Sequence, residues 1–177
     1  FNINTMLSRL SWEVADRKIS FAEAERQFEQ IITSDTQNKW VVLLLVTLAN
    51  ASFCRLFGGD AIAMGIVAVA TAAGYYLKQL LLGRGVDVRV VFLICSFVSS
   101  VLGATDTLFA IGTTPEIAIG TSVLYLVPGI PFLNSFSDML YRHYICAYSR
   151  FADAVVLTAC LSTGLCAGMF LMHVGMF

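Results

Sequence analysis

Five long, mainly apolar stretches follow the first 39 residues of the chain. Each is close to the roughly 20 residues that a helix needs to cross about 30 Å of hydrocarbon. Inside a bilayer the backbone must satisfy its own hydrogen bonds, which favours α-helices. The expected spans are Trp40–Phe57, Ala61–Leu77, Val90–Ala110, Ile117–Asn134 and Asp153–Phe177. The sequence therefore predicts an all-α polytopic membrane protein with five transmembrane helices.

The segment before these spans has a different character, because residues 1–39 hold 11 of the 23 charged side chains. Its apolar residues recur at the spacing of two short amphipathic helices. Ser20 and Glu23 have the spacing of a capping box, so the second helix is expected to begin there. We expect residues 1–39 to be cytoplasmic helices at the end of a longer N-terminal region, and residues 40–177 to be the membrane domain.

Composition excludes several classes of protein. Hydrophobic residues make up 58% of the chain, above the usual share of soluble domains, and the net charge of −1 provides no basic surface for nucleic acid. The five cysteines form no CxxC or Cys/His cluster, so they are interpreted as inert packing residues. No metal and no cofactor are expected.

Orientation follows from the positively charged residues between the spans, which stay on the cytoplasmic side during insertion. Five lie before the first span, three between the second and third spans, and two between the fourth and fifth, whereas the other two joints have none. This alternation predicts a protein with five spans. Its N-terminus would be cytoplasmic and its C-terminus outside.

The fourth span contains Leu126-Val127-Pro128-Gly129-Ile130-Pro131 near its middle. Pro128 and Pro131 lack amide hydrogens, and Gly129 tolerates conformations that a helix does not, so the helix is expected to break here. A broken helix at mid-membrane depth is typical of transporter binding sites. Pro131 suits the first turn of a new helix, whose free amides would attract an anion.

After the break, Asn134, Asp138 and Arg142 recur every four residues and would share one face of a helix. We interpret them as a polar path from the midplane to the cytoplasm, with Asp138 and Arg142 paired as a gate or proton relay. The alternative is a structural kink followed by an Asp–Arg pair that reaches the membrane surface.

A second polar cluster lies near the outer end of the first span and comprises Asn50, Arg55 and Asp60. An arginine at membrane depth is costly unless it has an acidic partner or a substrate. Asp60 is the first candidate partner of Arg55, and Asp106 in the next outer joint is the second; both acids are also candidate proton carriers. Alternatively, Arg55 extends to lipid headgroups. For Asn50, which lies deeper and is uncharged, the favoured interpretation is that it holds helices together.

Pairs of small residues at helical spacing, including Gly164 and Gly168, mark faces where helices approach closely. Packing within the chain is the favoured interpretation, and a homo-oligomer interface is the alternative. An enzyme is not expected, because the sequence has two histidines and contains no HExxH, GxSxG or phosphate-binding loop.

The motif Pro128-Gly129-Ile130-Pro131 followed by Asn134 and Asp138, together with the segment Phe53 to Asp60 after a first span, resembles the bacterial threonine/serine exporter family. The likeness is greatest to the larger, five-span subunit of the split exporters. It implies a small polytopic membrane partner and export of small hydrophilic carboxylates, either threonine and serine or a dicarboxylate such as succinate. A scaffold or regulatory subunit that does not itself transport is the alternative.

The resemblance and the residue chemistry together indicate two groups of site residues. The expected substrate-binding group is Asn50, Arg55, Pro128, Gly129, Pro131 and Asn134. The expected gating or proton-relay group is Asp60, Asp106, Asp138 and Arg142.

Overall fold

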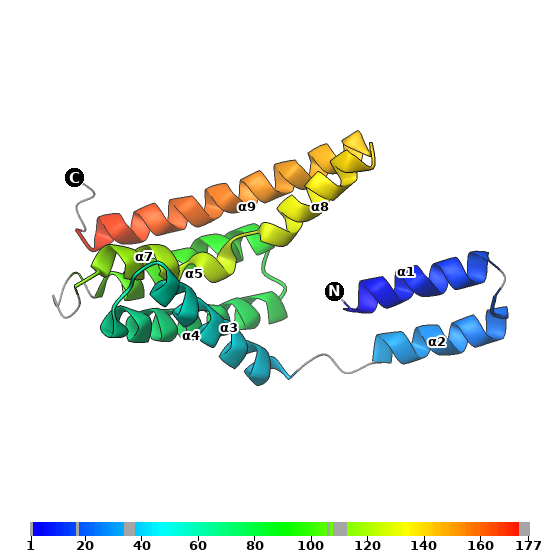
Figure 1. The fold of residues 1–177 in the computed structure, drawn as a ribbon, viewed down its shortest axis with the longest axis horizontal. Helices are drawn as coiled ribbons and strands as arrows, with labels where there is room; N and C mark the ends of the chain where they lie inside the picture. The colour runs from blue at the N-terminus through cyan, green and yellow to red at the C-terminus, as the bar shows by residue number, and fades with distance from the viewer. Residues whose placement is uncertain (1, 17, 34–37, 106, 108–112, 174–177) are drawn as a thin grey trace. The chain divides into compact units, whose positions relative to one another are not determined.

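The computed structural model describes residues 2–16, 18–33, 38–105, 107 and 113–173. All regular elements among these residues are helices, which confirms the all-α prediction. The helices are α1 (Asn2–Ala15), α2 (Phe21–Thr33), α3 (Lys39–Leu56), α4 (Ala61–Gly83), α5 (Val88–Gly103), α7 (Pro115–Ser122), the short 3-10 helix η1 (Leu124–Leu126), α8 (Gly129–Leu140) and α9 (Tyr144–Leu171) (Figure 1). The chain divides into two compact units, residues 1–39 and 40–177.

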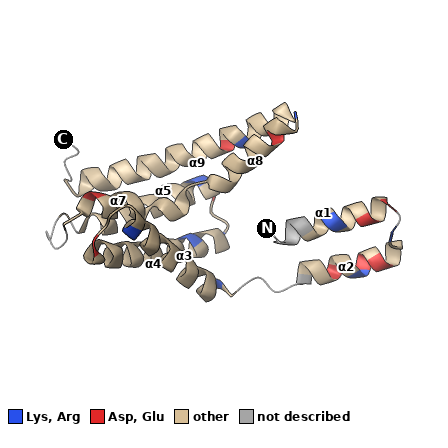
Figure 2. Ribbon diagram, viewed as in Figure 1, with Lys and Arg blue, Asp and Glu red and all other residues tan. Residues whose placement is uncertain are grey.

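The first unit is a hairpin of α1 and α2, held by the buried side chains of Leu10, Ala24 and Ile31. The second helix begins where the sequence predicts, because the Glu23 amide donates to the Ser20 hydroxyl oxygen over 3.4 Å. Charged side chains are frequent on both helices and sparse on the helices of the second unit (Figure 2).

In the second unit, α3, α4 and α9 are each long and apolar enough to cross a membrane. Together, α7 and α8 pass the same test as a fourth span that is bent by 59°. The remaining apolar helix, α5, has 16 residues and is shorter than a full span. The structure therefore supports three or four spans, and the fifth stays a prediction. The C-terminal part of the expected third span, at 106 and 108–110, lies outside the described residues.

Two helix boundaries differ from the expected spans. The second span continues through Lys78 to Gly83, and the last helix starts at Tyr144 instead of Asp153. Helical hydrogen bonding does not require apolar side chains, so a helix continues beyond the stretch that hydropathy identifies. Lys78 and Arg150 consequently lie on helices, where the sequence analysis placed them in joints.

The central helix of the second unit is α5, which packs against α4, α7 and α9. Gly164 and Gly168 of α9 lie directly on α5, because a Cβ added to either would collide with the hydroxyl of Ser96 or of Ser100. These glycines therefore serve packing within the chain, as the sequence analysis favoured. They let the backbones of α5 and α9 approach closely.

The stretch expected to form the fourth span is interrupted at the predicted position. The 3-10 turn ends at Leu126, and α8 begins at Gly129 after Pro128, which is buried. Pro131 lies in the first turn of α8, as expected for a residue without an amide hydrogen. The interruption separates α7 from α8 and turns the start of α8 toward α5 and α9 (Figure 1).

Candidate functional site

A cleft of about 500 Å³ lies beside the start of α8, where α5 and α9 approach it. Its volume is within the range of about 300–1,000 Å³ that is usual for small-ligand sites. It is lined by Asp87, Val88, Arg89, Pro131, Asn134, Arg150, Asp153 and Leu157. The cleft thus brings two predicted residues, Pro131 and Asn134, together with two arginines from other helices.

The arginines of the cleft each face an aspartate on a neighbouring helix. Arg150 of α9 donates from Nη1 to Asp138 Oδ2 of α8 over 2.6 Å. Arg89 of α5 lies 3.6 Å from Asp153 of α9, measured from Nη2 to Oδ1. The second pair is the longer one, and both its side chains are exposed, so the Arg89 guanidinium can be shared with a carboxylate ligand.

Local interactions hold the walls of the cleft. Asp87 caps the start of α5, where its Oδ1 accepts from the Arg89 amide over 2.8 Å. Ser135, beside Asn134, is buried and donates from its hydroxyl to the Ala147 carbonyl over 2.8 Å. This bond ties α8 to α9 and keeps Asn134 at the cleft.

The start of α8 provides fewer free amides than the sequence analysis expected. The Gly129 amide donates to the Val127 carbonyl over 2.8 Å, and Pro131 has no amide hydrogen. Phe132 donates back to the Pro128 carbonyl over 3.3 Å. Of the first helical amides, that of Ile130 is therefore the one available to a ligand. The cleft therefore offers positive charge through the side chains of Arg89 and Arg150, and not through a row of free amides.

The predicted pair of Asp138 and Arg142 is wrong. The helix ends at Leu140, and Arg142 has a backbone φ of 63°, so it no longer lies on the face that carries Asn134 and Asp138. Asp138 pairs instead with Arg150, which the turn after α8 brings back along α9. An acid remains at the predicted place, but its partner comes from another helix.

At the outer cluster, the predicted pair of Arg55 and Asp60 is not formed. Arg55 is exposed and donates from Nη1 to the Gly59 carbonyl over 3.2 Å. Asp60 caps α4, because its Oδ1 accepts from the Ala63 amide over 2.7 Å, and its Oδ2 accepts from the Thr113 amide over 2.8 Å. The hydrogen bond from the Thr113 backbone, with that from Ala63, lowers the pKa of Asp60 below its ordinary value. Asp60 therefore joins α4 to the start of α7.

Two further predicted residues have different outcomes. Asn50 is buried, and its amide nitrogen donates to Thr71 Oγ1 over 2.6 Å and to the Thr121 carbonyl over 2.9 Å. It holds α3 to α4 and α7, which is the role that its depth and lack of charge predicted. Asp106 lies outside the described residues.

Sequence reasoning missed Asp87, Arg89, Arg150 and Asp153 as site residues. Asp87, Arg89 and Arg150 lay in joints rich in positive charge, where the two arginines served only to predict orientation, and Asp153 was the first residue of the expected fifth span. Because the sequence separation between Arg89 and Asp153 is large, their proximity depends on the packing of α5 against α9.

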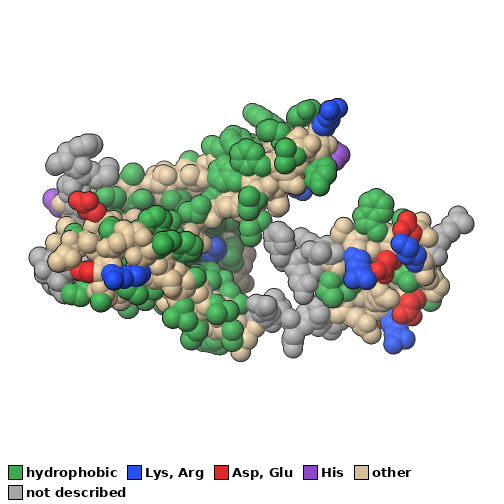
Figure 3. Space-filling view, in the orientation of Figure 1, with side chains coloured by type: hydrophobic (Ala, Val, Ile, Leu, Met, Phe, Trp, Pro, Cys, Tyr) green, Lys and Arg blue, Asp and Glu red, His purple; other side chains and the backbone are tan. Residues whose placement is uncertain are grey.

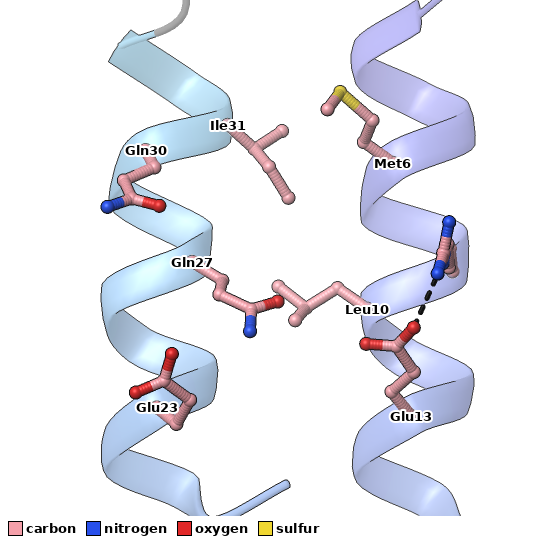
Figure 4. Close-up of a pocket in the computed structure, with 8 residues that line it drawn as sticks. Met6, Leu10, Glu13, Glu23, Gln27, Gln30 and Ile31 are labelled. Atoms are coloured by element: carbon pink, nitrogen blue, oxygen red, sulfur yellow. Dashed lines mark hydrogen bonds and ion pairs between the residues drawn. The ribbon is translucent and has the colours of Figure 1, made fainter. Parts of the chain in front are cut away.

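The hairpin of the first unit has a hollow of its own, of about 480 Å³ (Figure 4). Leu10 and Ile31 point into it from the two helices, and the pair formed by Arg9 Nε and Glu13 Oε1, 2.9 Å apart, lies on one side. The hollow contains no pair of arginines, so it is a weaker candidate for carboxylate binding than the cleft.

A pair of apolar helices bent at an interruption that lines a polar cleft is typical of membrane transporters. The chain belongs to the threonine/serine exporter family, since the family model described as "Putative threonine/serine exporter" matches residues 2–172. No solved structure matches the chain.

Curated relatives have a related description. The chain is 32% identical over 158 residues to the "Probable succinate transporter subunit YjjP" of Klebsiella aerogenes, covering 88% of this chain and 61% of that protein. It is also 32% identical over 147 residues to the protein of the same name from Escherichia coli K12, covering 82% of this chain and 57% of that protein. The chain thus spans about six tenths of the length of these relatives.

Proposed function

We propose that this chain is a subunit of an inner-membrane exporter for small hydrophilic carboxylates. The observation that carries the proposal is the cleft beside the interrupted span, where Asn134 lies with Arg89 and Arg150. The names of the family and of the relatives support transport of threonine, serine or succinate. All three molecules have at least one carboxylate.

The cleft has the groups that such a substrate needs. Guanidinium groups bind carboxylates through two parallel hydrogen bonds. In the proposed mechanism a substrate carboxylate enters the cleft and takes the place of Asp153 beside Arg89, which is the longer of the two ion pairs. Asn134 donates its amide hydrogens to the same carboxylate or to a substrate hydroxyl. The tighter pair of Asp138 and Arg150 opens when the substrate passes or when Asp138 takes up a proton.

The interruption between α7 and α8 is the proposed hinge of this movement. Val127 and Pro128 join two helical pieces that meet at 59°, and the peptide there has few helical hydrogen bonds to break. A change in this angle would move Pro131 and Asn134 relative to α5 and α9. The cleft would then open or close without unfolding a helix.

The proposed topology has five spans, with the N-terminus in the cytoplasm and the C-terminus outside. The arginines of the cleft belong to the joints expected to be cytoplasmic, so the cleft would be the inner entrance of the path. Asp60 and Arg55 lie at the other ends of the helices, near the outer surface. Residues 1–39 would be cytoplasmic.

The proposed partner is a small polytopic membrane subunit. The relatives are named as subunits. Many apolar side chains of the second unit are exposed, including Leu133, Leu140 and Ile145 on the α8–α9 hairpin (Figure 3). Lipid, a partner helix or a second copy of the chain would cover them.

Transport in membrane vesicles tests this function. Vesicles that contain the chain and its partner subunit are compared with vesicles that contain either protein alone, using radiolabelled succinate and L-threonine. We expect movement of at least one probe only with both proteins, and its loss in Arg89→Gln with Arg150→Gln. If the arginine variants transport as well as the unmodified protein, the cleft is not the site, and a scaffold subunit becomes the better description.

A further inference from the structure

Lys78 of α4 is a half-buried cation that two aromatic rings hold. Its ammonium nitrogen lies 5.1 Å from the centre of the Phe92 ring on α5 and 5.8 Å from the ring of Tyr75, one turn earlier on α4. Within the part of the chain that the structure describes, no carboxylate forms an ion pair with it. By contrast, Arg89 and Arg150 each face an aspartate.

Aromatic rings hold a cation without neutralising it. The ring faces attract the ammonium group, but its positive charge is still available to an anion. A charged group within a membrane helix is costly and commonly marks a path for a substrate or an ion. The charge of Lys78 is therefore still available to an anion, whereas the charge of Arg150 is already paired with Asp138.

The ring of Tyr75 also lines a second hollow of the membrane unit. This groove has a volume of about 390 Å³ and lies between α3, α4 and the η1 turn. Its lining residues are Val46, Ala49, Asn50, Phe53, Phe57, Tyr75, Leu124, Tyr125 and Val127. Apart from Asn50 and the two tyrosines, the lining is apolar, so it fits the hydrocarbon part of a small molecule but offers a carboxylate no charge of its own.

The groove and the cleft meet the interrupted span at neighbouring positions. Val127 lines the groove, and Pro131, on the first turn of α8, lines the cleft. Tyr75 is the contact between the groove and Lys78, since the ammonium lies over its ring. Lys78 does not itself line the groove. Because the lysine side chain is long and flexible, its ammonium group would turn from the Tyr75 ring toward an anion that enters the groove.

We propose that Lys78 binds a carboxylate of the transported molecule on the α4 side of the interrupted span. This inference rests on the proposed function and adds a third cation to the two arginines of the cleft. The ligand class is a small carboxylate with a short carbon chain, its apolar part against the groove and its charge against Lys78. A lipid phosphate would offer the same cation a negative charge, and the experiment separates these two sources.

The first test measures transport of radiolabelled succinate and L-threonine in vesicles that contain the chain and its partner subunit. Lys78→Met keeps the length of the side chain and removes its charge, whereas Lys78→Arg retains the charge. Arg84→Met is the matched control, because Arg84 is an exposed cation just after α4. We expect Lys78→Met to raise KM by about tenfold or more, as the loss of a charge-assisted hydrogen bond would do. Lys78→Arg should recover most of this loss, and the control should have the KM of the unmodified protein.

The second test adds a readout that does not depend on transport, which is the protection of a cysteine from modification. Lys78→Cys is modified with a positively charged aminoethyl thiol reagent, with Lys78→Met treated in parallel to account for the native cysteines. We expect the reagent to restore activity, and succinate or L-threonine to slow the modification. The experiment is repeated in vesicles of phosphatidylcholine with and without phosphatidylglycerol.

Three results would overturn the inference. An unchanged KM in Lys78→Met would leave the lysine with only a structural contact to the aromatic rings, even if the variant unfolds at a lower temperature. Failure of both probes to slow the modification would show that neither binds there. Protection that depends on phosphatidylglycerol would assign the site to a lipid headgroup. If the unmodified protein transports neither probe but succinate protects the cysteine, the proposed function fails and the binding site stands.

Discussion

The carboxylate of Asp138 accepts a hydrogen bond from the guanidinium of Arg150 across the α8–α9 hairpin, with 2.6 Å between Oδ2 and Nη1. The two residues are 12 positions apart, and the Ser135 hydrogen bond to Ala147 holds the same two helices together. The pair lies next to the cleft through Arg150, which lines it. In the proposed mechanism it is therefore placed to respond to the carboxylate of the substrate.

Removal of the acid in this pair should affect transport more than folding. The Arg150 side chain is 52% exposed and the Asp138 side chain 19% exposed, so solvent screens the pair, and it contributes about 1 kcal/mol to the free energy of unfolding. We expect Asp138→Asn to unfold within a few degrees of the unmodified protein and to lose most of its transport. The control is Asp16→Asn, which removes an exposed ion pair with Lys18 in the first unit. If Asp138→Asn transports at the rate of the unmodified protein, Asp138 has no gating role.

Asn134 should be needed for substrate binding. Its side chain lines the cleft one turn after Pro131, and Asn134→Ala removes an amide without changing the helix. We expect KM to rise by about tenfold, as for the loss of a hydrogen bond to a charged group. Ser137→Ala, at an exposed position of the same helix, should have no effect. Equal KM values for the two variants would remove Asn134 from the site.

Gly164 should be essential for the approach of α5 and α9. An added Cβ would collide with the Leu93 carbonyl, and it would lie 3.1 Å from the Phe97 amide nitrogen, both backbone atoms that cannot rotate away. We expect Gly164→Ala to lower the free energy of unfolding by about 1–3 kcal/mol, measured by thermal unfolding in detergent. Gly65→Ala is the control, because a Cβ there meets open space, and it should leave stability equal or raise it by up to about 1 kcal/mol. Equal loss in both variants would contradict the packing argument.

Asp60 should make the stability of the membrane unit depend on pH in the acid range. Hydrogen bonds, first that from the Thr113 backbone, lower its pKa in the folded state below the ordinary value of 3.8. The folded state thus favours the ionised form, so the stabilisation is complete above pH 3.8 and disappears as the pH falls through the lower, folded-state pKa. The melting temperatures of the unmodified protein and Asp60→Asn should differ at neutral pH and converge in strong acid. A constant difference down to that range would contradict the assignment.

The proposed topology places Thr113 on the outer side of the membrane and Tyr144 on the cytoplasmic side. In a variant whose five cysteines are replaced by alanine, Thr113→Cys should react with an impermeant maleimide added to intact cells. Tyr144→Cys should react only after the membrane is opened. The reverse pattern would invert the orientation and place the cleft at the outer surface.

The sequence alone determined those features that depend on local covalent properties. Apolar length predicted membrane helices, and the missing amides of Pro128 and Pro131 predicted the interruption of the fourth span. The cap at Ser20 likewise predicted the start of α2. Each of these follows from the residue itself and its immediate neighbours, so no knowledge of the packing was needed.

Only the tertiary structure decided which charged groups meet. Asp138 pairs with Arg150 and not with Arg142, because α8 ends at Leu140 and the chain turns back as α9. Asp60 accepts a hydrogen bond from Thr113, which lies just before α7, and does not pair with Arg55. Hydrogen-bond partners that are distant in sequence depend on the crossing of helices, and apolar periodicity indicates which face is buried but not which residue of another helix it will meet.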